Sequence, residues 1–423
     1  MDQKFPVVNC FLAKYVGKWY HFYIKFDYME RYNMDYSKLQ YLNVLFEDEI
    51  KAGEIHGASI RVVHNNQIVH DDRFGYANKE KKIPTAKDTI YRMYSMTKPI
   101  TSVATMILYE RGDLDLLSPV SDYLEGFKNQ KVITKNGLED AYRSVTIQDL
   151  LNMTSGVVYP DDTIESGRRM AKLYTEADEG HYKGNPMSTM ELCNRIGEIP
   201  LEFQPGERWH YGASADILGA IVQIVSNMKY SDFLKKEIFE PLGMVDTAFY
   251  VPKEKQDRFA ENYIFDEEAK KLVPFKESFL ATYDMLSPPA FESGGAGLVS
   301  TIEDYSKFAT MLVNGGSLDN INILGRKTVE YMATPGLTKE QAVSYNWDTQ
   351  YGYSYGNLMR VFVDPIKATS NGSVGEFGWD GWTGNYFFID PKENLFYIYM
   401  IQRGGFSNAR LRRRMRQIIY SGI

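Results

Sequence analysis

The sequence predicts an α/β (α+β) protein with one sheet built from both ends of the chain and a mainly helical segment between them. Strand-like segments lie near the two ends, whereas most segments with helical periodicity lie in the middle. A chain of 423 residues with 44% hydrophobic and 24% charged residues is long enough to bury a large core. We therefore expect a sheet closed by the two ends, with the helical segment inserted into it.

This distribution divides the chain into three parts. Residues 34–115 and 290–423 are predicted to form the α/β domain, and residues 116–289 the mainly helical domain. Residues 1–33 are rich in aromatic residues and lysine and show no clear period, so they are interpreted as an N-terminal extension. Two explanations stay open: either this extension packs on the body of the protein, or translation starts at Met34.

The α/β part begins with a helix and a hairpin. Leucines, Phe46 and Ile50 fall at helical spacing after Met34. Residues 58–64 and 67–73 are strand-like, and the Asn65-Asn66 pair between them suits a tight turn. These segments predict a helix followed by a two-stranded hairpin.

The middle part has clear helical periodicity in several segments. Residues 145–151 are typical of a capped short helix, and longer helices are predicted over 214–226 and 230–239. Residues 157–200 are polar without an obvious period, and we expect an irregular flap over a site there. Residues 252–290 give no clear assignment.

The last third is mostly strand-like. A helix over 302–314, ended by Gly315-Gly316, is followed by a final series of elements. The predicted strands cover 351–363, 377–379, 385–389 and 395–402, and a last helix closes the chain. In that helix Leu411, Met415, Ile418 and Ile419 are expected to pack inward. Its arginines are expected on the solvent-facing side: Arg410, Arg412, Arg413, Arg414 and Arg416.

The residues from Ser95 to Lys98 carry a possible nucleophile and base. Apolar residues recur at helical spacing from Ser95 to Arg111, and serine is a residue type suited to cap such a helix. Lys98 lies one turn after Ser95, so both side chains can share one face. Burial and the helix dipole would favour the neutral amine, which can take a proton from the hydroxyl. A capping serine followed by a solvated lysine gives the same pattern, so the motif needs support from the rest of the chain.

Composition argues against several other functions. A net charge of −7 with mixed signs does not favour a nucleic-acid partner. No apolar run is long enough to span a bilayer, and the N-terminus lacks a signal peptide, so a cytoplasmic location without membrane association is expected. Two cysteines and six histidines without ligand spacing predict neither a disulfide framework nor a metal site, and no cofactor is expected.

Two further stretches join the first motif to form a recognisable set. They are Pro205-Gly206-Glu207-Arg208-Trp209-His210-Tyr211-Gly212-Ala213 and Gly378-Trp379-Asp380-Gly381-Trp382-Thr383-Gly384. With Ser95-Met96-Thr97-Lys98, they resemble the motifs of the serine β-lactamase and penicillin-binding-protein superfamily. The chain looks most like the class C β-lactamase-related esterases, or family VIII carboxylesterases. Supporting signatures follow in the same order: 150–156, 241–244 and 293–298.

The resemblance implies a fold and a set of roles. It implies a β-lactamase-like fold with an antiparallel sheet and an active site between the two domains. Ser95 would be the nucleophile, and Lys98 with Tyr211 would transfer protons. The third motif would line the cleft, and the N–H groups of Ser95 and Trp382 would form the oxyanion hole. The implied site residues are therefore Ser95, Lys98, Tyr211, Trp379, Gly381 and Trp382, and His210 has no catalytic role.

Three departures from the motifs bear on the substrate. Ala213 replaces the asparagine of the β-lactamase Tyr-x-Asn motif, and Trp379 replaces the basic residue that meets a substrate carboxylate. Both favour a neutral ester held by aromatic walls, for which Trp209, Trp379 and Trp382 are candidates. Asp380 is unusual: it could repel anionic substrates, or point away because side chains alternate along a strand.

The sequence thus predicts a cofactor-free serine hydrolase that cleaves small esters through an acyl-serine intermediate. Two alternatives stay open: a peptidase or amidase for D-amino-acid substrates or a weak β-lactamase, and a non-catalytic ligand-binding module with the same fold. The expected partner is a small-molecule ester or amide. Oligomeric state is not predicted.

Overall fold

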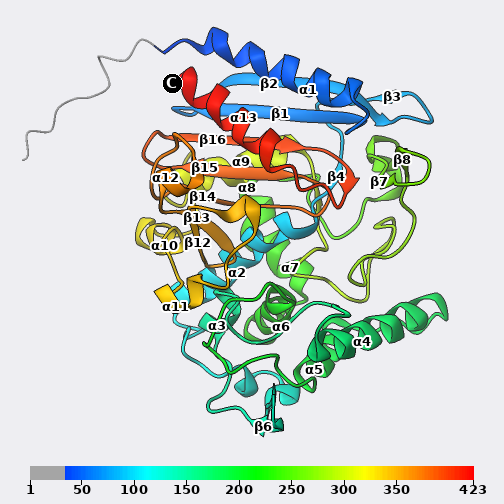
Figure 1. The fold of residues 1–423 in the computed structure, drawn as a ribbon, viewed down its shortest axis with the longest axis vertical. Helices are drawn as coiled ribbons and strands as arrows, with labels where there is room; N and C mark the ends of the chain where they lie inside the picture. Colours follow the sequence, from blue (N-terminus) through cyan, green and yellow to red (C-terminus); the bar gives the residue numbers. More distant parts are fainter. Residues whose placement is uncertain (1–33) are drawn as a thin grey trace, which may run out of the picture.

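One large sheet organises the computed structural model, which describes residues 34–423 (Figure 1). The predicted extension over residues 1–33 lies outside the described residues. All neighbouring strands of the sheet are antiparallel, in the order β12-β13-β14-β15-β16-β1-β2-β3. Their bounds are β1 (Gly57–His64), β2 (Gln67–Asn78), β3 (Ile83–Pro84), β12 (Tyr353–Gly356), β13 (Met359–Phe362), β14 (Phe377–Asp380), β15 (Tyr386–Asp390) and β16 (Leu395–Met400). The antiparallel sheet with flanking helices confirms the predicted fold class.

The two ends of the chain meet at the centre of this sheet. Strand β1 pairs with β16, with Val62 opposite Tyr397. Figure 1 shows the blue N-terminal strands directly beside the orange C-terminal strands. Strand β1 is buried at every position, including the polar residues Ser59, Arg61 and His64. Asn65 and Asn66 both have positive φ values, 52° and 60°, as the predicted tight turn requires.

Helices cover both faces of the sheet (Figure 1). Helices α1 (Tyr41–Lys51) and α13 (Ala409–Ser421) pack on one face in a separate apolar cluster. Helices α2 (Thr97–Arg111) and α9 (Ile302–Val313) pack on the other face and join the main core. Thr301 caps α9 by accepting a hydrogen bond from the Asp304 N–H, so the sequence itself fixes where this helix starts.

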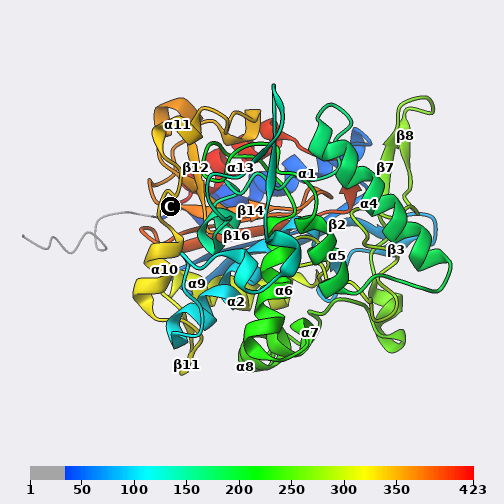
Figure 2. The ribbon, with the colours of Figure 1, turned by 90° about the horizontal axis from the view of Figure 1, so that it is seen from below.

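The mainly helical part packs against α2, and Figure 2 shows α2 and α6 beside each other. Thr146 and Asp149 form a capping box at the start of the first of its helices, as the sequence indicates. The helices of this part are α3 (Ile147–Leu151), α4 (Glu165–Tyr182), α5 (Thr189–Gly197), α6 (Ser214–Ser226), α7 (Tyr230–Leu234) and α8 (Glu240–Leu242), with a π-helical turn over Lys235–Phe239. The exact domain boundaries stay a prediction.

The remaining elements are short. The small helices are α10 (Arg326–Met332), α11 (Lys339–Ala342) and α12 (Pro365–Ala368). The small strands are β4 (Tyr91–Arg92), β5 (Lys131–Thr134), β6 (Gly137–Asp140), β7 (Tyr263–Asp266), β8 (Lys271–Pro274), β9 (Val299–Ser300), β10 (Ser317–Leu318), β11 (Ile321–Asn322) and β17 (Arg403–Gly404). No helix within residues 34–423 combines the length and the apolar character needed to cross a bilayer.

Two predicted segments differ from the structure. Residues 157–200 contain the two helices α4 and α5 rather than an irregular flap. Helix α4 was missed because its buried residues form a narrow stripe in an otherwise polar sequence. The predicted strand over 351–363 is a hairpin, β12 and β13, because Asn357 and Leu358 adopt positive φ values and turn the chain.

The prediction that all the arginines of the last helix face solvent is wrong for two of them. Arg412 and Arg416 are buried, 6% and 3% exposed. Arg416 forms an ion pair with the fully buried Glu376 and donates a hydrogen bond to Ser370 Oγ at 2.9 Å. Arg412 forms an ion pair with Asp380. Carboxylates beneath the helix, which lie far away in the sequence, therefore decide which arginines turn inward.

We expect Arg416→Met to lower the free energy of unfolding by about 3–5 kcal/mol, because it leaves the Glu376 carboxylate buried without its cation. The matched control is Arg413→Met on the exposed side of the same helix, with an expected change within about 0.5 kcal/mol. Denaturant unfolding of both variants measures the difference. Equal destabilisation by the two substitutions would contradict the inward role of Arg416.

Candidate active site

Ser95 lies in a tight helical turn directly before α2. The turn spans Tyr94–Met96, and α2 starts at Thr97 with Met96 in the capping position. Ser95 is therefore not the N-cap residue that its position suggested. Tyr94 has a φ of 45°, a left-handed conformation that costs a non-glycine residue about 1–3 kcal/mol. This backbone turn presents the half-buried Ser95 hydroxyl at the start of the helix.

Lys98 lies beneath Ser95 and is fully buried. Its Nζ is 3.2 Å from Ser95 Oγ, 3.1 Å from the Tyr159 hydroxyl oxygen and 2.9 Å from the Gly295 carbonyl oxygen. Burial lowers the pKa of Lys98 to about 7, although Asp216 and Asp380 act in the opposite direction. A substantial fraction of Lys98 is therefore a neutral amine near neutral pH, which is what a general base requires.

The three contacts of Lys98 match the hydrogen-bonding capacity of a neutral amine. The Gly295 carbonyl can only accept a hydrogen bond, and the Tyr159 oxygen accepts one from Lys98. In the neutral form of the amine these two acceptors would occupy both N–H groups, which leaves the lone pair for the Ser95 hydroxyl, whose oxygen is 3.2 Å away. The arrangement can accept the proton of the serine hydroxyl.

Tyr159 and Asp216 were not singled out from the sequence. Burial raises the pKa of Asp216, and Lys98 together with hydrogen bonds from Ser293, Gly295 and Tyr159 lowers it. The Gly295 N–H donates to Asp216 Oδ1 at 2.9 Å. Asp216 therefore positions two partners of Lys98: Gly295, whose carbonyl oxygen accepts a hydrogen bond from Lys98, and the Tyr159 phenol. No spacing rule links residues 159 and 216 to Ser95, so this network was visible only in three dimensions.

Tyr211 lies on the other side of the site. Lys98 Nζ is 4.7 Å from the centre of the Tyr211 ring, and the indole N–H of Trp379 donates to the Tyr211 oxygen at 3.2 Å. Burial raises the pKa of Tyr211 well above its usual value, and hydrogen bonds with Ser95 and Trp379 offset only part of this effect. The phenol therefore keeps its proton at neutral pH.

The third motif lies at the end of β14 and in the turn after it. A side chain on Gly381 would bring its Cβ to 2.4 Å from the Met93 carbonyl oxygen, so only glycine allows this turn to approach the residues before Ser95. Trp382 follows in the turn and stacks on Phe279 with ring centres 4.1 Å apart. The Trp382 ring therefore forms part of the aromatic lining.

Asp380 is neutralised by two arginines. It forms ion pairs with Arg412 and, at 3.5 Å, with Arg360. Burial raises the pKa of the Asp380 carboxyl, but the arginines outweigh burial and hold it below its usual range. The sequence left open whether Asp380 repels anionic substrates or points away from the cleft. Its ion pairs favour a role in anchoring β14 over a role as a free negative charge that repels anions.

These residues surround one cavity of about 520 Å³. Five of the predicted site residues line it, and Lys98 lies buried below: Ser95, Tyr211, Trp379, Gly381 and Trp382. Tyr159, Phe279 and Trp347 add aromatic faces that the sequence did not reveal. Trp209 and His210 are not among the lining residues; Trp209 is buried behind Tyr211, against Tyr345 and Trp347.

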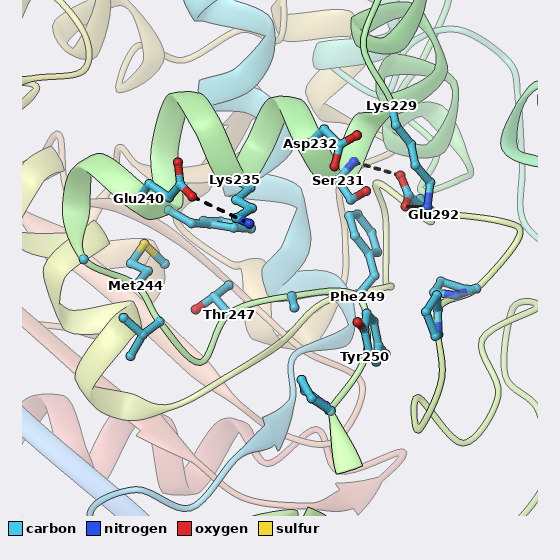
Figure 3. Close-up of a pocket in the computed structure, with 17 residues that line it drawn as sticks. Lys229, Ser231, Asp232, Lys235, Glu240, Met244, Thr247, Phe249, Tyr250 and Glu292 are labelled. Carbon is cyan, nitrogen blue, oxygen red and sulfur yellow. Dashed lines mark hydrogen bonds and ion pairs between the residues drawn. The ribbon is translucent and has the colours of Figure 1, made fainter. Parts of the chain in front are cut away.

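A second cavity of about 590 Å³ lies apart from Ser95 (Figure 3). Four of its five charged lining residues form ion pairs, Lys229 with Glu292 at 2.7 Å and Lys235 with Glu240 at 3.6 Å, and the fifth is Asp232. The described residues 34–423 contain no group of three or more His, Cys, Asp or Glu residues suited to a metal ion.

A family model described as Beta-lactamase matches residues 42–420. The chain belongs to the beta-lactamase family. The predicted resemblance to the serine β-lactamase and penicillin-binding-protein superfamily is thereby confirmed, with esterases among the relatives. Members of this family are serine hydrolases, and the arrangement of Ser95 and Lys98 agrees with that class.

Individual relatives cover most of the chain. Protein Rv1367c of Mycobacterium tuberculosis is 30% identical over 361 residues, which cover 83% of this chain and 86% of that protein. Esterase EstB of Burkholderia gladioli is 27% identical, covering 84% of this chain and 88% of its own. The solved structure of EstCE1, described as a hydrolase with promiscuous acyltransferase activity, superposes with a TM-score of 0.74 at 22% identity, covering 91% of this chain and 98% of that one. The last comparison bears on the fold alone.

Proposed function

We propose that this member of the beta-lactamase family is a serine esterase that cleaves small carboxylic esters through an acyl-serine intermediate. The observation that carries the proposal is the contact set of Lys98. A buried amine with a pKa of about 7 lies within hydrogen-bond distance of two acceptors and of the Ser95 hydroxyl, so its neutral form can donate to the acceptors and accept the hydroxyl proton. A serine hydroxyl becomes a nucleophile only when such a base is within reach.

Acylation would begin with attack of Ser95 Oγ on the ester carbonyl carbon. Lys98 would accept the hydroxyl proton as the bond forms. The N–H groups of Ser95 and Trp382 would stabilise the oxyanion, for which each donor is typically worth about 100–1,000-fold in rate. When the intermediate collapses, the Lys98–Tyr211 pair would return the proton to the departing alcohol, with Tyr211 as the protonated donor.

Deacylation would repeat these steps with water as the nucleophile. The Lys98–Tyr211 pair would accept a proton from water, and the hydroxide would attack the acyl carbon. Collapse would break the bond to Ser95 Oγ, which would recover a proton from the pair. The products are the carboxylic acid and the free enzyme. No cofactor takes part in any step.

The walls of the cavity support an ester over a β-lactam. Trp379 occupies the place where a basic residue meets the carboxylate of β-lactams, and its indole N–H is engaged by Tyr211. Ala213 is buried and has no amide to hold an acylamino side chain. The relative named esterase EstB agrees with this preference.

We expect the purified protein to hydrolyse p-nitrophenyl butyrate with a kcat/KM at least about 100-fold above that for a chromogenic cephalosporin, because the site lacks the groups that bind the lactam's carboxylate and amide. Both reactions are followed by absorbance under identical conditions. Preferential cephalosporin hydrolysis would support the weak β-lactamase alternative. Turnover of D-amino-acid amides without ester turnover would support the peptidase alternative, and binding without any turnover would support a binding module.

The pH dependence of this reaction follows from Lys98. The neutral amine is the active form, so kcat/KM should rise with pH through about 7 and level off about one unit above, falling about tenfold per unit on the acid side. Steady-state hydrolysis of a neutral ester from pH 5 to 9, corrected for spontaneous hydrolysis, measures this profile. A profile that is flat across this range would contradict Lys98 as the base.

A further inference from the structure

Helix α4 places two polar side chains, Tyr174 and Asp178, at the wall of the cavity that contains Ser95. They lie one turn apart on the same helix face. Tyr174 is 5% exposed, and its hydroxyl has no hydrogen-bond partner within residues 34–423. Asp178 accepts a hydrogen bond from Ser278 Oγ at 2.7 Å through Oδ2, but its Oδ1 is buried without a partner in the same part of the chain. Such groups are costly unless something pairs with them.

Asp178 also lacks a positive partner among the described residues. No Lys, Arg or His nitrogen of residues 34–423 lies within 4.0 Å of its carboxylate. Its neighbours are the Ser278 hydroxyl and Tyr283, whose pKa is raised by burial, by the Asp178 charge and by a side-chain hydrogen bond with Asp178, so the contacts of this carboxylate are with neutral groups. The other carboxylate of the cavity wall, Asp380, is matched by Arg412 and Arg360. Of the two carboxylates in this wall, Asp178 is therefore the one that forms no ion pair with a cation among residues 34–423.

Aromatic rings form much of the rest of the cavity wall. The lining includes Tyr159, Phe279, Trp347 and Trp382 in addition to Tyr174. The faces of such rings attract cations, and an aromatic enclosure is a recurrent way to bind alkylammonium groups. A cavity lined by this carboxylate and by several aromatic rings fits a positively charged organic group better than an anion or a plain hydrocarbon.

We propose that Asp178 and these aromatic faces bind an alkylammonium group of the substrate. The natural substrate would then be an ester that carries a positively charged nitrogen, on either its acyl part or its alcohol part. This inference rests on the proposed esterase function, because it identifies the substrate class of the same site. It assigns Asp178 to substrate recognition and not to the proton transfers.

The test compares cationic esters with neutral isosteres in which a tert-butyl group replaces trimethylammonium. Butyrylthiocholine and its isostere place the charge on the alcohol part; the p-nitrophenyl ester of trimethylammonio-butyrate and its isostere place it on the acyl part. For at least one pair, the wild type should show a cationic-to-neutral ratio of kcat/KM of about tenfold or more, the range expected for a desolvated quaternary cation held by aromatic faces beside a carboxylate. This ratio should fall at least tenfold in Asp178→Asn.

Glu179→Gln is the matched control, because it removes the same charge from the next residue of α4, where Glu179 pairs with Lys183 in solvent. The ratio should not change in this variant. A wild-type ratio near one for both pairs, a ratio unaffected by Asp178→Asn, or an equal fall in Glu179→Gln would overturn the inference. In the first case hydrolysis of the neutral isosteres would still support the esterase function.

Failure of the esterase function can be distinguished from failure of the cation site. If the wild type hydrolyses none of the four esters, binding of phenyltrimethylammonium is measured by calorimetry. A Kd at least tenfold weaker for Asp178→Asn than for wild type and Glu179→Gln would support the cation site without the esterase. Equal values for the three proteins, or no binding by wild type, would overturn it.

Discussion

Ser95→Ala is expected to lower kcat for p-nitrophenyl butyrate by about 10⁴–10⁶-fold, the scale seen when a catalytic serine is removed from other hydrolases. Alanine retains the backbone N–H proposed for the oxyanion hole but cannot form the acyl intermediate. The fold should be preserved, because Ser95 is not the cap of α2 and only loses its contacts with Lys98 and Tyr211. Steady-state kinetics and thermal unfolding of the same preparation check both statements.

The matched control for this experiment is Ser102→Ala. Ser102 lies on the same helix, is fully buried, and its hydroxyl has no partner within residues 34–423. Its removal should leave kcat within about threefold of wild type, since surface or core changes away from the site act mainly on stability. Ester turnover that survives in Ser95→Ala would mean that another residue is the nucleophile.

Lys98→Met is expected to lower kcat/KM by about 10³–10⁵-fold, because it removes the proposed base and leaves the hydroxyl without an acceptor for its proton. Methionine has a similar length and suits the buried position. Release of p-nitrophenol, which reports acylation, should fall together with turnover. Activity within tenfold of wild type would show that Lys98 is not the base.

The same substitution should change stability in a pH-dependent way. The folded-state pKa of Lys98, about 7, lies below its usual value of 10.5, so folding forces the release of a proton or the burial of a charge. This penalty is fully present below about pH 7 and disappears as pH rises toward 10.5. The stability advantage of Lys98→Met over wild type should therefore be largest below pH 7 and shrink at higher pH, as measured by denaturant unfolding. A difference that grows with pH would contradict the lowered pKa.

Local sequence was sufficient where one segment determines its own structure. The turn at Asn65-Asn66, the capping box of Thr146 and Asp149, and the bounds of α6 follow from residues within one or two turns of each other. The same holds for the pairing of Ser95 with Lys98, because one helical turn places both side chains on one face. The order of the three motifs along the chain then predicted the family and the fold class.

Contacts between distant segments decided the rest. The low pKa of Lys98 depends on burial by segments that include Tyr159 and Gly295, and Asp216 positions both. Arg412 and Arg416 turn inward because they form ion pairs with Asp380 and Glu376, which lie beneath the helix but far away in the sequence.

The sequence by itself determined that this is a member of a serine hydrolase family with Ser95 and Lys98 one turn apart. Only the tertiary structure decided the electrostatics of the site and the unmatched charge of Asp178. The physical reason is that desolvation and charge pairing depend on which atoms surround a group, and here those atoms come from residues far away in the chain.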